Sequence, residues 1–268
     1  MSIFINGKRI DFKKEAKSEK GETKNIDITK TETSLGVERI NIGTLNADIK
    51  VYAKDTSEIT ARLYGSFNSE EVSLDMAKQG GQIFISTKTK GDSTPSIFRG
   101  SSVVIHNVNI INGTSSYSSS SSELNLDVTI PLNLLPSLFI KSTTGDVFVD
   151  ASVSLESINV ITTNGDMEID TLPKNVSITT TNGDVEFDCI AKNDCNLNIT
   201  TTNGDVSFSF IDAQSKMKFS TVNGDIIDKS KHTDGGKYIV SGKVQTTNGD
   251  IVYKSINTTR SPSNIFIE

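Results

Sequence analysis

Apolar and polar residues alternate along most of the second half of the chain. Cys195, Leu197 and Ile199 occupy the apolar positions before one polar turn, and Val206 and Phe208 occupy them after it. A period of two places successive side chains on opposite faces of an extended strand, and it is typical of strands with one buried face. The pattern predicts pairs of half-buried β-strands separated by tight turns.

The turn between the strands is the pentapeptide Thr-Thr-Asn-Gly-Asp or a close variant of it. Six copies occur from Ser142 onward, at intervals of 20, 18, 21, 20 and 25 residues, and the longest interval contains an insertion at 231–237. Their central glycines are Gly145, Gly165, Gly183, Gly204, Gly224 and Gly249. Six copies in one register predict a repeat architecture with a unit of about 20 residues.

The Asn-Gly step supplies the tight turn, because both residue types tolerate a positive φ angle. The five complete turns are Asn164-Gly165, Asn182-Gly183, Asn203-Gly204, Asn223-Gly224 and Asn248-Gly249. Asn-Gly between alternating strands is also a strong hairpin signal, so an array of hairpins in a meander or barrel competes with a β-solenoid in which equivalent turns stack.

Repetition of all five letters favours the stacked arrangement. A hairpin needs only a satisfactory turn, whereas stacked coils present the same side chains about 4.8 Å apart and allow Thr and Asn ladders. We therefore predict an all-β, single-stranded β-solenoid (β-helix) of roughly nine or ten coils of about 20 residues each, with a lean towards right-handed winding and with irregular N-terminal coils.

The pattern divides the chain into three parts within one continuous domain that starts at about residue 34. Residues 1–33 are Lys- and Glu-rich beyond Asp11 and are predicted to be an N-terminal arm or cap. Residues 34–123 are predicted to form irregular coils with a Ser-rich excursion loop, and residues 124–268 the regular solenoid.

The repeats, together with the segment from Leu126 to Lys141 that precedes them, resemble the bacterial putative-adhesin family of β-strand-repeat proteins. That family is a domain of unknown function, similar to auto-transporter adhesin head domains. The resemblance covers residues 37–260 and is strongest over 124–256. It implies a single-stranded β-helix and an adhesin-like role.

Charge and composition narrow the range of partners. The formal net charge of -6 leaves no basic surplus for neutralising phosphates, so we expect no nucleic-acid partner. No run approaches the roughly 18 apolar residues of a membrane span, so we expect no direct membrane insertion. No signal-peptide core is visible at the N-terminus, which predicts a cytoplasmic protein, or one associated with a membrane or envelope through a partner.

Groups suited to catalysis are sparse. His106 and His232 have no partner motif and are expected to be ordinary surface residues. Cys189 and Cys195 share the parity of the apolar positions, which predicts buried reduced thiols that could meet inside the fold. No nucleophile elbow, phosphate loop, dinucleotide fingerprint or His/Cys metal spacing is present.

One alternative is a calcium-binding repeat module. Stacking would align the turn aspartates in a column, whose mutual repulsion a hard cation could offset. The residues of this column are Asp146, Asp166, Asp184, Asp205, Asp225 and Asp250. The competing interpretation is that each carboxylate accepts hydrogen bonds from backbone N–H groups at its own turn.

A second alternative is a carbohydrate-active β-helix enzyme, but coils of about 20 residues leave little room for a cleft, and repeated acids are not a catalytic pair. The sequence favours a non-enzymatic scaffold or protein-interaction module, without a cofactor, that presents flat repeat faces. Its expected partner is another protein or a second copy, bound along the stack or at an open terminal coil.

Overall fold

The computed structural model describes residues 2–5, 8–11, 24–67, 72–89, 123–230 and 236–256. These residues form strands in three sheets and no helix. β1 (Ser2–Ile5) and β2 (Lys8–Asp11) make a separate antiparallel pair. The excursion loop, His106 and His232 lie outside the described residues. No helix in the described part of the chain could span a membrane.

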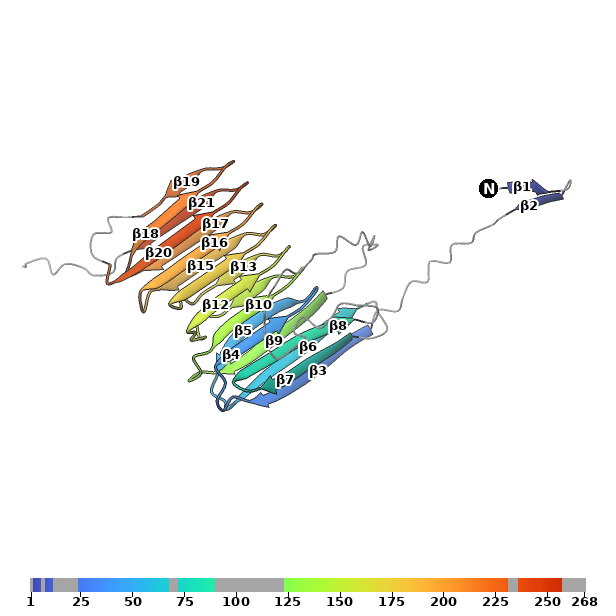
Figure 1. Ribbon diagram of the computed structural model, residues 1–268, viewed down its shortest axis with the longest axis horizontal. Coiled ribbons are helices and arrows are strands. Elements are labelled where there is room, and N and C mark those ends of the chain that lie inside the picture. Colours follow the sequence, from blue (N-terminus) through green and yellow to red (C-terminus); the bar gives the residue numbers. More distant parts are fainter. Residues whose placement is uncertain are drawn as a thin grey trace, which may run out of the picture.

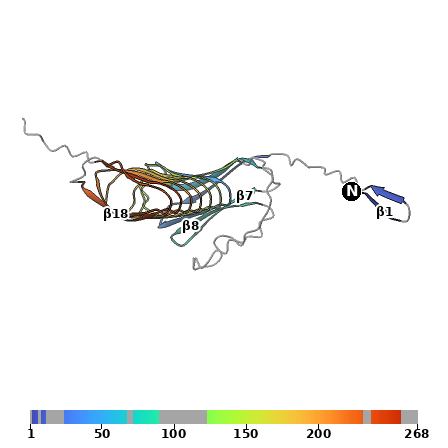
Figure 2. The same ribbon diagram turned by 90° about the horizontal axis from the view of Figure 1, so that it is seen from above.

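Two large sheets lie face to face and make up the body of the molecule (Figures 1 and 2). In spatial order the nine-stranded sheet contains β18 (Ala213–Ser220), β20 (Tyr238–Gln245), β16 (Cys195–Thr200), β14 (Asn175–Thr179), β12 (Ser157–Ile161), β10 (Ser137–Lys141), β4 (Arg39–Gly43), β8 (Gln82–Thr89) and β7 (Val72–Gln79). The ten-stranded sheet contains β19 (Ile226–Asp228), β21 (Ile251–Ile256), β17 (Val206–Ile211), β15 (Val185–Ile190), β13 (Met167–Ile169), β11 (Val147–Val149), β5 (Asp48–Lys54), β9 (Glu123–Pro131), β6 (Glu58–Phe67) and β3 (Lys24–Thr33).

The two strands that flank each repeat turn belong to different sheets. β16 lies in the nine-stranded sheet and β17 in the ten-stranded sheet, and both pair in parallel with the equivalent strands of neighbouring repeats. The turn is therefore a corner between two layers and not the tip of a hairpin. Corner residues of neighbouring repeats pair directly, as Asn182 does with Asn203. The chain is all-β and solenoid-like, and the hairpin alternative is excluded.

The corners of the six repeats require glycine because of the neighbouring coil in the stack, whereas the corner between β4 and β5 has Ala47 at this position. Gly204 has a φ of 159°, and a Cβ built on it would lie 2.1 Å from the carbonyl oxygen of Gly183. The corner asparagines tolerate a positive φ but do not adopt one, because Asp212 is the only described non-glycine residue with a positive φ. Asparagine is present for its side chain, which bonds to the next coil.

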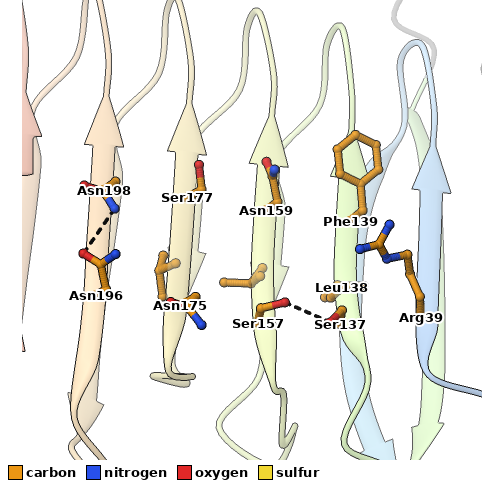
Figure 3. Close-up of a pocket in the computed structure, with 12 residues that line it drawn as sticks. Arg39, Ser137, Leu138, Phe139, Ser157, Asn159, Asn175, Ser177, Asn196 and Asn198 are labelled. Carbon is orange, nitrogen blue, oxygen red and sulfur yellow. Dashed lines mark hydrogen bonds between the residues drawn. The ribbon is translucent and has the colours of Figure 1, made fainter. Parts of the chain in front are cut away.

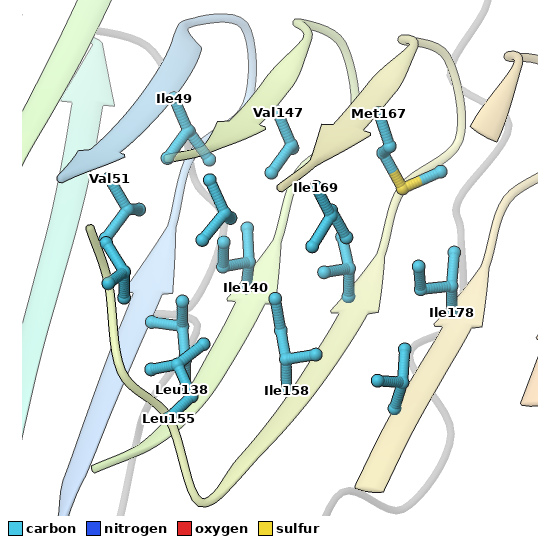
Figure 4. Close-up of a cluster of buried hydrophobic side chains, with 14 of the residues drawn as sticks. Ile49, Val51, Leu138, Ile140, Val147, Leu155, Ile158, Met167, Ile169 and Ile178 are labelled. Atoms are coloured by element: carbon cyan, nitrogen blue, oxygen red, sulfur yellow. The ribbon is translucent and has the colours of Figure 1, made fainter. Parts of the chain in front are cut away.

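The core fills the space between the layers with one apolar column per strand position. Ile40, Leu138, Ile158, Val176 and Leu197 form one such column on the nine-stranded sheet, all nearly inaccessible to solvent. Figure 4 shows equivalent residues of both sheets facing one another across the interior. Every second side chain of each strand is buried in such a column, which explains the period of two in the sequence.

Coil order departs from chain order at the C-terminal end. The sixth repeat (β20 and β21) lies between the fourth (β16 and β17) and the fifth (β18 and β19). The prediction that each repeat stacks on its predecessor in the chain is wrong here.

The side chains of the fifth repeat explain this exchange. Asp228 occupies the inward row that Phe187, Phe208 and Tyr253 occupy in neighbouring strands. An internal position would bury its charge, which is unfavourable, whereas the outermost position leaves it exposed. The more apolar sixth repeat takes the covered slot, where Tyr253 stacks on Phe219 with ring centroids 4.6 Å apart.

The N-terminal end shows a similar exchange and finishes in antiparallel strands. β4 and β5 lie between β8 and β9 on one side and β10 and β11 on the other. Beyond them β7, β6 and β3 add in antiparallel orientation, and Lys78 of β7 donates to the backbone oxygen of Thr33, at the end of β3, at 3.2 Å. Part of the predicted arm or cap, 24–33, is thus the outer strand of a sheet.

Within the described residues, seven pairs of adjoining strands run from the nine-stranded sheet into the ten-stranded sheet through a corner, compared with the nine or ten coils expected. They start with β4 and β5 and end with β20 and β21. β8 and β9 extend the two layers by one further position, but residues 90–122 separate them in the chain.

Candidate binding surface

The corner asparagines form a continuous side-chain ladder. Asn203 donates from Nδ2 to Oδ1 of Asn182 at 2.7 Å and accepts at Oδ1 from Nδ2 of Asn248 at 2.7 Å. Asn182 bonds to Asn164, and Asn223 to Asn248, in the same way. All five predicted corner asparagines are therefore brought together in a structural role, in which each interior amide donates one ladder bond and accepts another.

The corner aspartates form a second ladder beside the first. The backbone nitrogen of each aspartate donates to Oδ1 of the aspartate in the adjacent coil, at 2.7–3.0 Å. In stack order the column is Asp48, Asp146, Asp166, Asp184, Asp205, Asp250 and Asp225. The backbone donor belongs to the neighbouring coil. The sequence had instead suggested a donor in the aspartate's own turn.

Metal-ligand groupings are absent from the part of the chain that the structure describes: no three His, Cys, Asp or Glu side chains converge there. Each corner contributes one carboxylate, and in every coil except the outermost, which carries Asp225, one carboxylate oxygen already accepts a backbone hydrogen bond. The column can therefore be explained without a cation.

The outer face of the nine-stranded sheet carries a shallow trough of about 320 Å³ (Figure 3). Two rows of side chains from β10, β12, β14 and β16 line it. One row is Ser137, Ser157, Asn175 and Asn196, and the other is Phe139, Asn159, Ser177 and Asn198. Arg39 of β4 extends the first row beside Ser137.

Half of the polar side chains of the trough have no hydrogen-bond partner among the described residues. Ser157 donates to Ser137 at 2.9 Å, and Asn198 donates to Asn196 at 3.3 Å. Asn159, Asn175 and Ser177 are exposed on the same face. An amide offers two donors and an acceptor, so the trough presents hydrogen-bonding groups of both kinds on rigid strands, with one cation at its edge.

The outer face of the ten-stranded sheet has a different character. It carries Asp150, Glu168, Asp170, Glu186 and Asp188 on or beside three neighbouring strands, and Glu168 and Glu186 are direct cross-strand neighbours. Partial burial, followed by the charge of the four surrounding carboxylates, raises the pKa of Asp170. The outer face of the ten-stranded sheet is thus acidic around β11, β13 and β15, whereas the trough on the opposite face carries amides and hydroxyls and no carboxylate.

The cysteines are in the interior, as free thiols. Burial raises the pKa of Cys195 to about 12 and raises that of Cys189 as well, so neither is a reactive thiolate near neutral pH. Cys189 donates to the backbone oxygen of Ile169 at 3.2 Å.

Sequence reasoning missed the trough. Its serines and asparagines are visible in the sequence as the polar half of each alternating strand, but β4 brings Arg39 beside Ser137 from far along the chain. The corner motif could be recognised because the same five residues repeat in each coil, whereas the outward Ser and Asn residues vary from strand to strand.

Comparison with known proteins agrees with this architecture. Residues 37–252 match the model of the Toastrack DUF4097 family, and the chain belongs to that family. This confirms the resemblance seen in the repeats. No curated protein matches the chain.

A solved structure with a TM-score above 0.5 shows the same fold. A putative cell adhesion protein from Clostridium sporogenes superposes with a TM-score of 0.55 at 12% identity, over 87% of this chain and 100% of that one. A putative adhesin from Bacteroides fragilis gives a TM-score of 0.41 at 15% identity, over 86% of this chain and 97% of that one. At these identities the likeness concerns the fold alone.

Proposed function

We propose that the chain is a right-handed β-solenoid that acts as a non-enzymatic, adhesin-like binding module. The outer face of the nine-stranded sheet is its binding surface. The observation that carries this proposal is the trough, where exposed Asn159, Asn175 and Ser177 stand on paired strands between Arg39 and Asn198. The names of the superposing adhesion proteins agree with a binding role.

The trough is suited to binding because its strands are held in place before a partner arrives. Parallel neighbours on both sides fix β12 and β14, so little conformational entropy is lost when their side chains are engaged. Its Asn and Ser side chains also have no ionic charge to desolvate. The acidic face lacks this advantage, since adjacent carboxylates repel one another.

A non-catalytic role agrees with the chemistry of the described residues. The thiols are buried with raised pKa values, and the turn carboxylates accept backbone hydrogen bonds. General acid–base work requires a positioned group with a pKa near the working pH, and no residue of the trough is of that kind.

The experiment compares binding by the full chain and by two matched variants. The probe is an array of purified bacterial surface proteins and oligosaccharides. The double variant Asn159→Lys/Ser177→Lys places two bulky cations on the trough, and Glu186→Lys places one on the opposite face. We expect at least one probe to be retained by the wild-type chain and by Glu186→Lys, and to be lost from the double variant.

Two results would overturn the proposal. Binding of every probe with no dependence on Asn159 and Ser177 would place the binding surface elsewhere. Conversion of an oligosaccharide during incubation, detected by mass spectrometry, would make the protein an enzyme. Thermal melting of all three chains controls for folding.

A further inference from the structure

The two ends of the stack differ in how they are finished (Figure 1). At one end β7 and β3 are antiparallel additions tied together through Lys78. At the other end the sheets stop at β18 and β19, which pair only with β20 and β21 among the described strands. Among the described residues, β18 therefore has one edge without a strand partner, although the backbone oxygen of Ala213 accepts from Oγ of Ser255.

Backbone alternation shows which groups face the open side. The oxygens of Asp212 and Ser220 accept from Tyr238 and Thr246 of the β20 region at 3.1 and 3.0 Å. Since successive residues of a strand point their N–H and C=O groups to opposite sides, the even-numbered residues of β18 bond to β20. The groups of Ser215, Met217 and Phe219 therefore point away from the sheet.

Apolar surface accompanies this edge. Met217 and Phe219 of β18 are only partly buried, and at the same end Val222 is 74% and Ile226 is 47% exposed. Ile226 occupies the row in which Val206 and Ile251 are fully buried. The interior of the solenoid is uncovered at this end, and a further strand would cover part of it.

The outward side chains at this edge are cationic. Lys216 and Lys218 project from β18, and Lys243 of β20 lies directly beside Lys218. All three are exposed, and none takes part in the ion pairs found among the described residues. A strand laid against β18 would bring its outward side chains about 5 Å from Lys216 and Lys218.

A second copy of this chain fits the edge poorly. The two antiparallel registers that cover most of β18 place Lys216 opposite Lys216 or Lys218 of the other copy, and like charges in that position destabilise a pair. Head-to-tail addition would pair β18 with β7 at the other end of another copy, and the outward carboxylate of β7, Asp75, is already paired with Lys88 of its own chain.

We infer that the open edge of β18 is a docking site for an extended segment of another protein with acidic side chains at every second position and apolar side chains between them. The acids pair with Lys216 and Lys218, the apolar residues cover Met217 and Phe219, and backbone bonds extend the nine-stranded sheet. This site goes beyond the proposed function and shares no residue with the trough.

The test measures fluorescence anisotropy of labelled nine-residue peptides titrated with the full chain. One peptide alternates glutamate with valine, and its partner alternates lysine with valine. We expect the glutamate peptide to bind at least about tenfold more tightly, and less tightly in high salt. The variant Lys216→Glu/Lys218→Glu should reverse the preference, whereas Lys192→Glu, in the exposed loop after β15, should leave it unchanged.

A second variant tests the backbone. Ser215→Pro removes an N–H from the open edge while leaving the bonds to β20 intact, so it should abolish binding of both peptides without lowering the melting temperature greatly. If Ser215→Pro binds normally, or charge reversal leaves the preference unchanged, or the glutamate peptide does not bind, the inference is wrong. A wild-type dimer in light scattering that becomes a monomer in Ser215→Pro would instead assign the edge to a second copy.

These outcomes are separable from failure of the trough proposal, because Asn159→Lys/Ser177→Lys leaves β18 untouched and should bind the glutamate peptide normally.

Discussion

The backbone nitrogen of Asp205 donates a hydrogen bond of 2.8 Å to Oδ1 of Asp184, across the boundary between two adjacent coils. The same bond recurs along the column, so each carboxylate satisfies a donor of its neighbour. These bonds offset part of the repulsion among the stacked carboxylates, because a carboxylate is a strong acceptor for backbone N–H. The requirement for aspartate is therefore a requirement of stacking.

Asp184→Asn should be tolerated, because the amide keeps an acceptor oxygen in the same place and removes one charge from the column. We expect a change in unfolding free energy within about 0.5 kcal/mol. Asp184→Ala removes the acceptor and should cost about 1 kcal/mol, since the N–H of Asp205 loses its partner. Urea denaturation measures both. Equal losses in the two variants would contradict the ladder.

Millimolar calcium should leave the melting temperature unchanged, and a chelator should do the same. The reason is that one oxygen of each corner aspartate, except Asp225 in the outermost coil, already accepts a hydrogen bond from a backbone N–H group. Differential scanning calorimetry checks this. A rise of several degrees with calcium that disappears in Asp184→Asn would revive the calcium-binding alternative.

Interior and terminal rungs of the asparagine ladder should differ in energy. Asn203→Ala removes two side-chain bonds, one to Asn182 and one from Asn248, whereas Asn223→Ala removes only the bond to Asn248. At roughly 0.5 to 1 kcal/mol per bond, the first variant should be destabilised about twice as much as the second. Chemical denaturation of the two proteins compares them directly. A larger loss at Asn223 would mean that local turn geometry, and not the ladder, decides.

Gly204→Ala should be among the most destabilising single changes, at about 3 kcal/mol or more. The added Cβ would lie 2.1 Å from the oxygen of Gly183, and backbone on both sides would have to move. Gly80→Ala is the control, because Gly80 has a φ of 60° but a Cβ added to it would meet no atom within 4 Å. It should lose only the roughly 1 to 2 kcal/mol of a left-handed residue. Similar losses at both sites would show that φ alone matters.

Stability should fall as the pH rises above 10. Burial, and then the hydrogen bond to Asp228, raise the pKa of Tyr253 to about 12. In the unfolded chain a tyrosine ionises near pH 10, so between those values the unfolded state has lost a proton that the folded state keeps. Tyr253→Phe should weaken this dependence, as measured by urea denaturation from pH 8 to 11. An unchanged slope in the variant would assign the effect to other groups.

The alternating strands and the repeated pentapeptide were sufficient to predict the layered, solenoid-like fold. Each corner contacts the same corner in the next coil, so one local pattern encodes a global contact, as at Asn182 and Asn203. The polar face of the trough was present in the same alternation. The position of the cation at the edge of the trough could not be predicted from that alternation, because the strand pairing that puts Arg39 beside Ser137 involves residues far apart in the chain.

The sequence by itself determined the strands, the corners and the inward rows, because these depend on short patterns that every coil repeats. Tertiary structure decided the order of the coils. Equivalent corners are interchangeable in the ladders, so the order depends on which side chains tolerate burial. Tyr253 packs between Phe208 and Phe219, while Asp228 stays at the open end. That choice also leaves β18 as the exposed edge, since a charge is more stable in water than inside the stack.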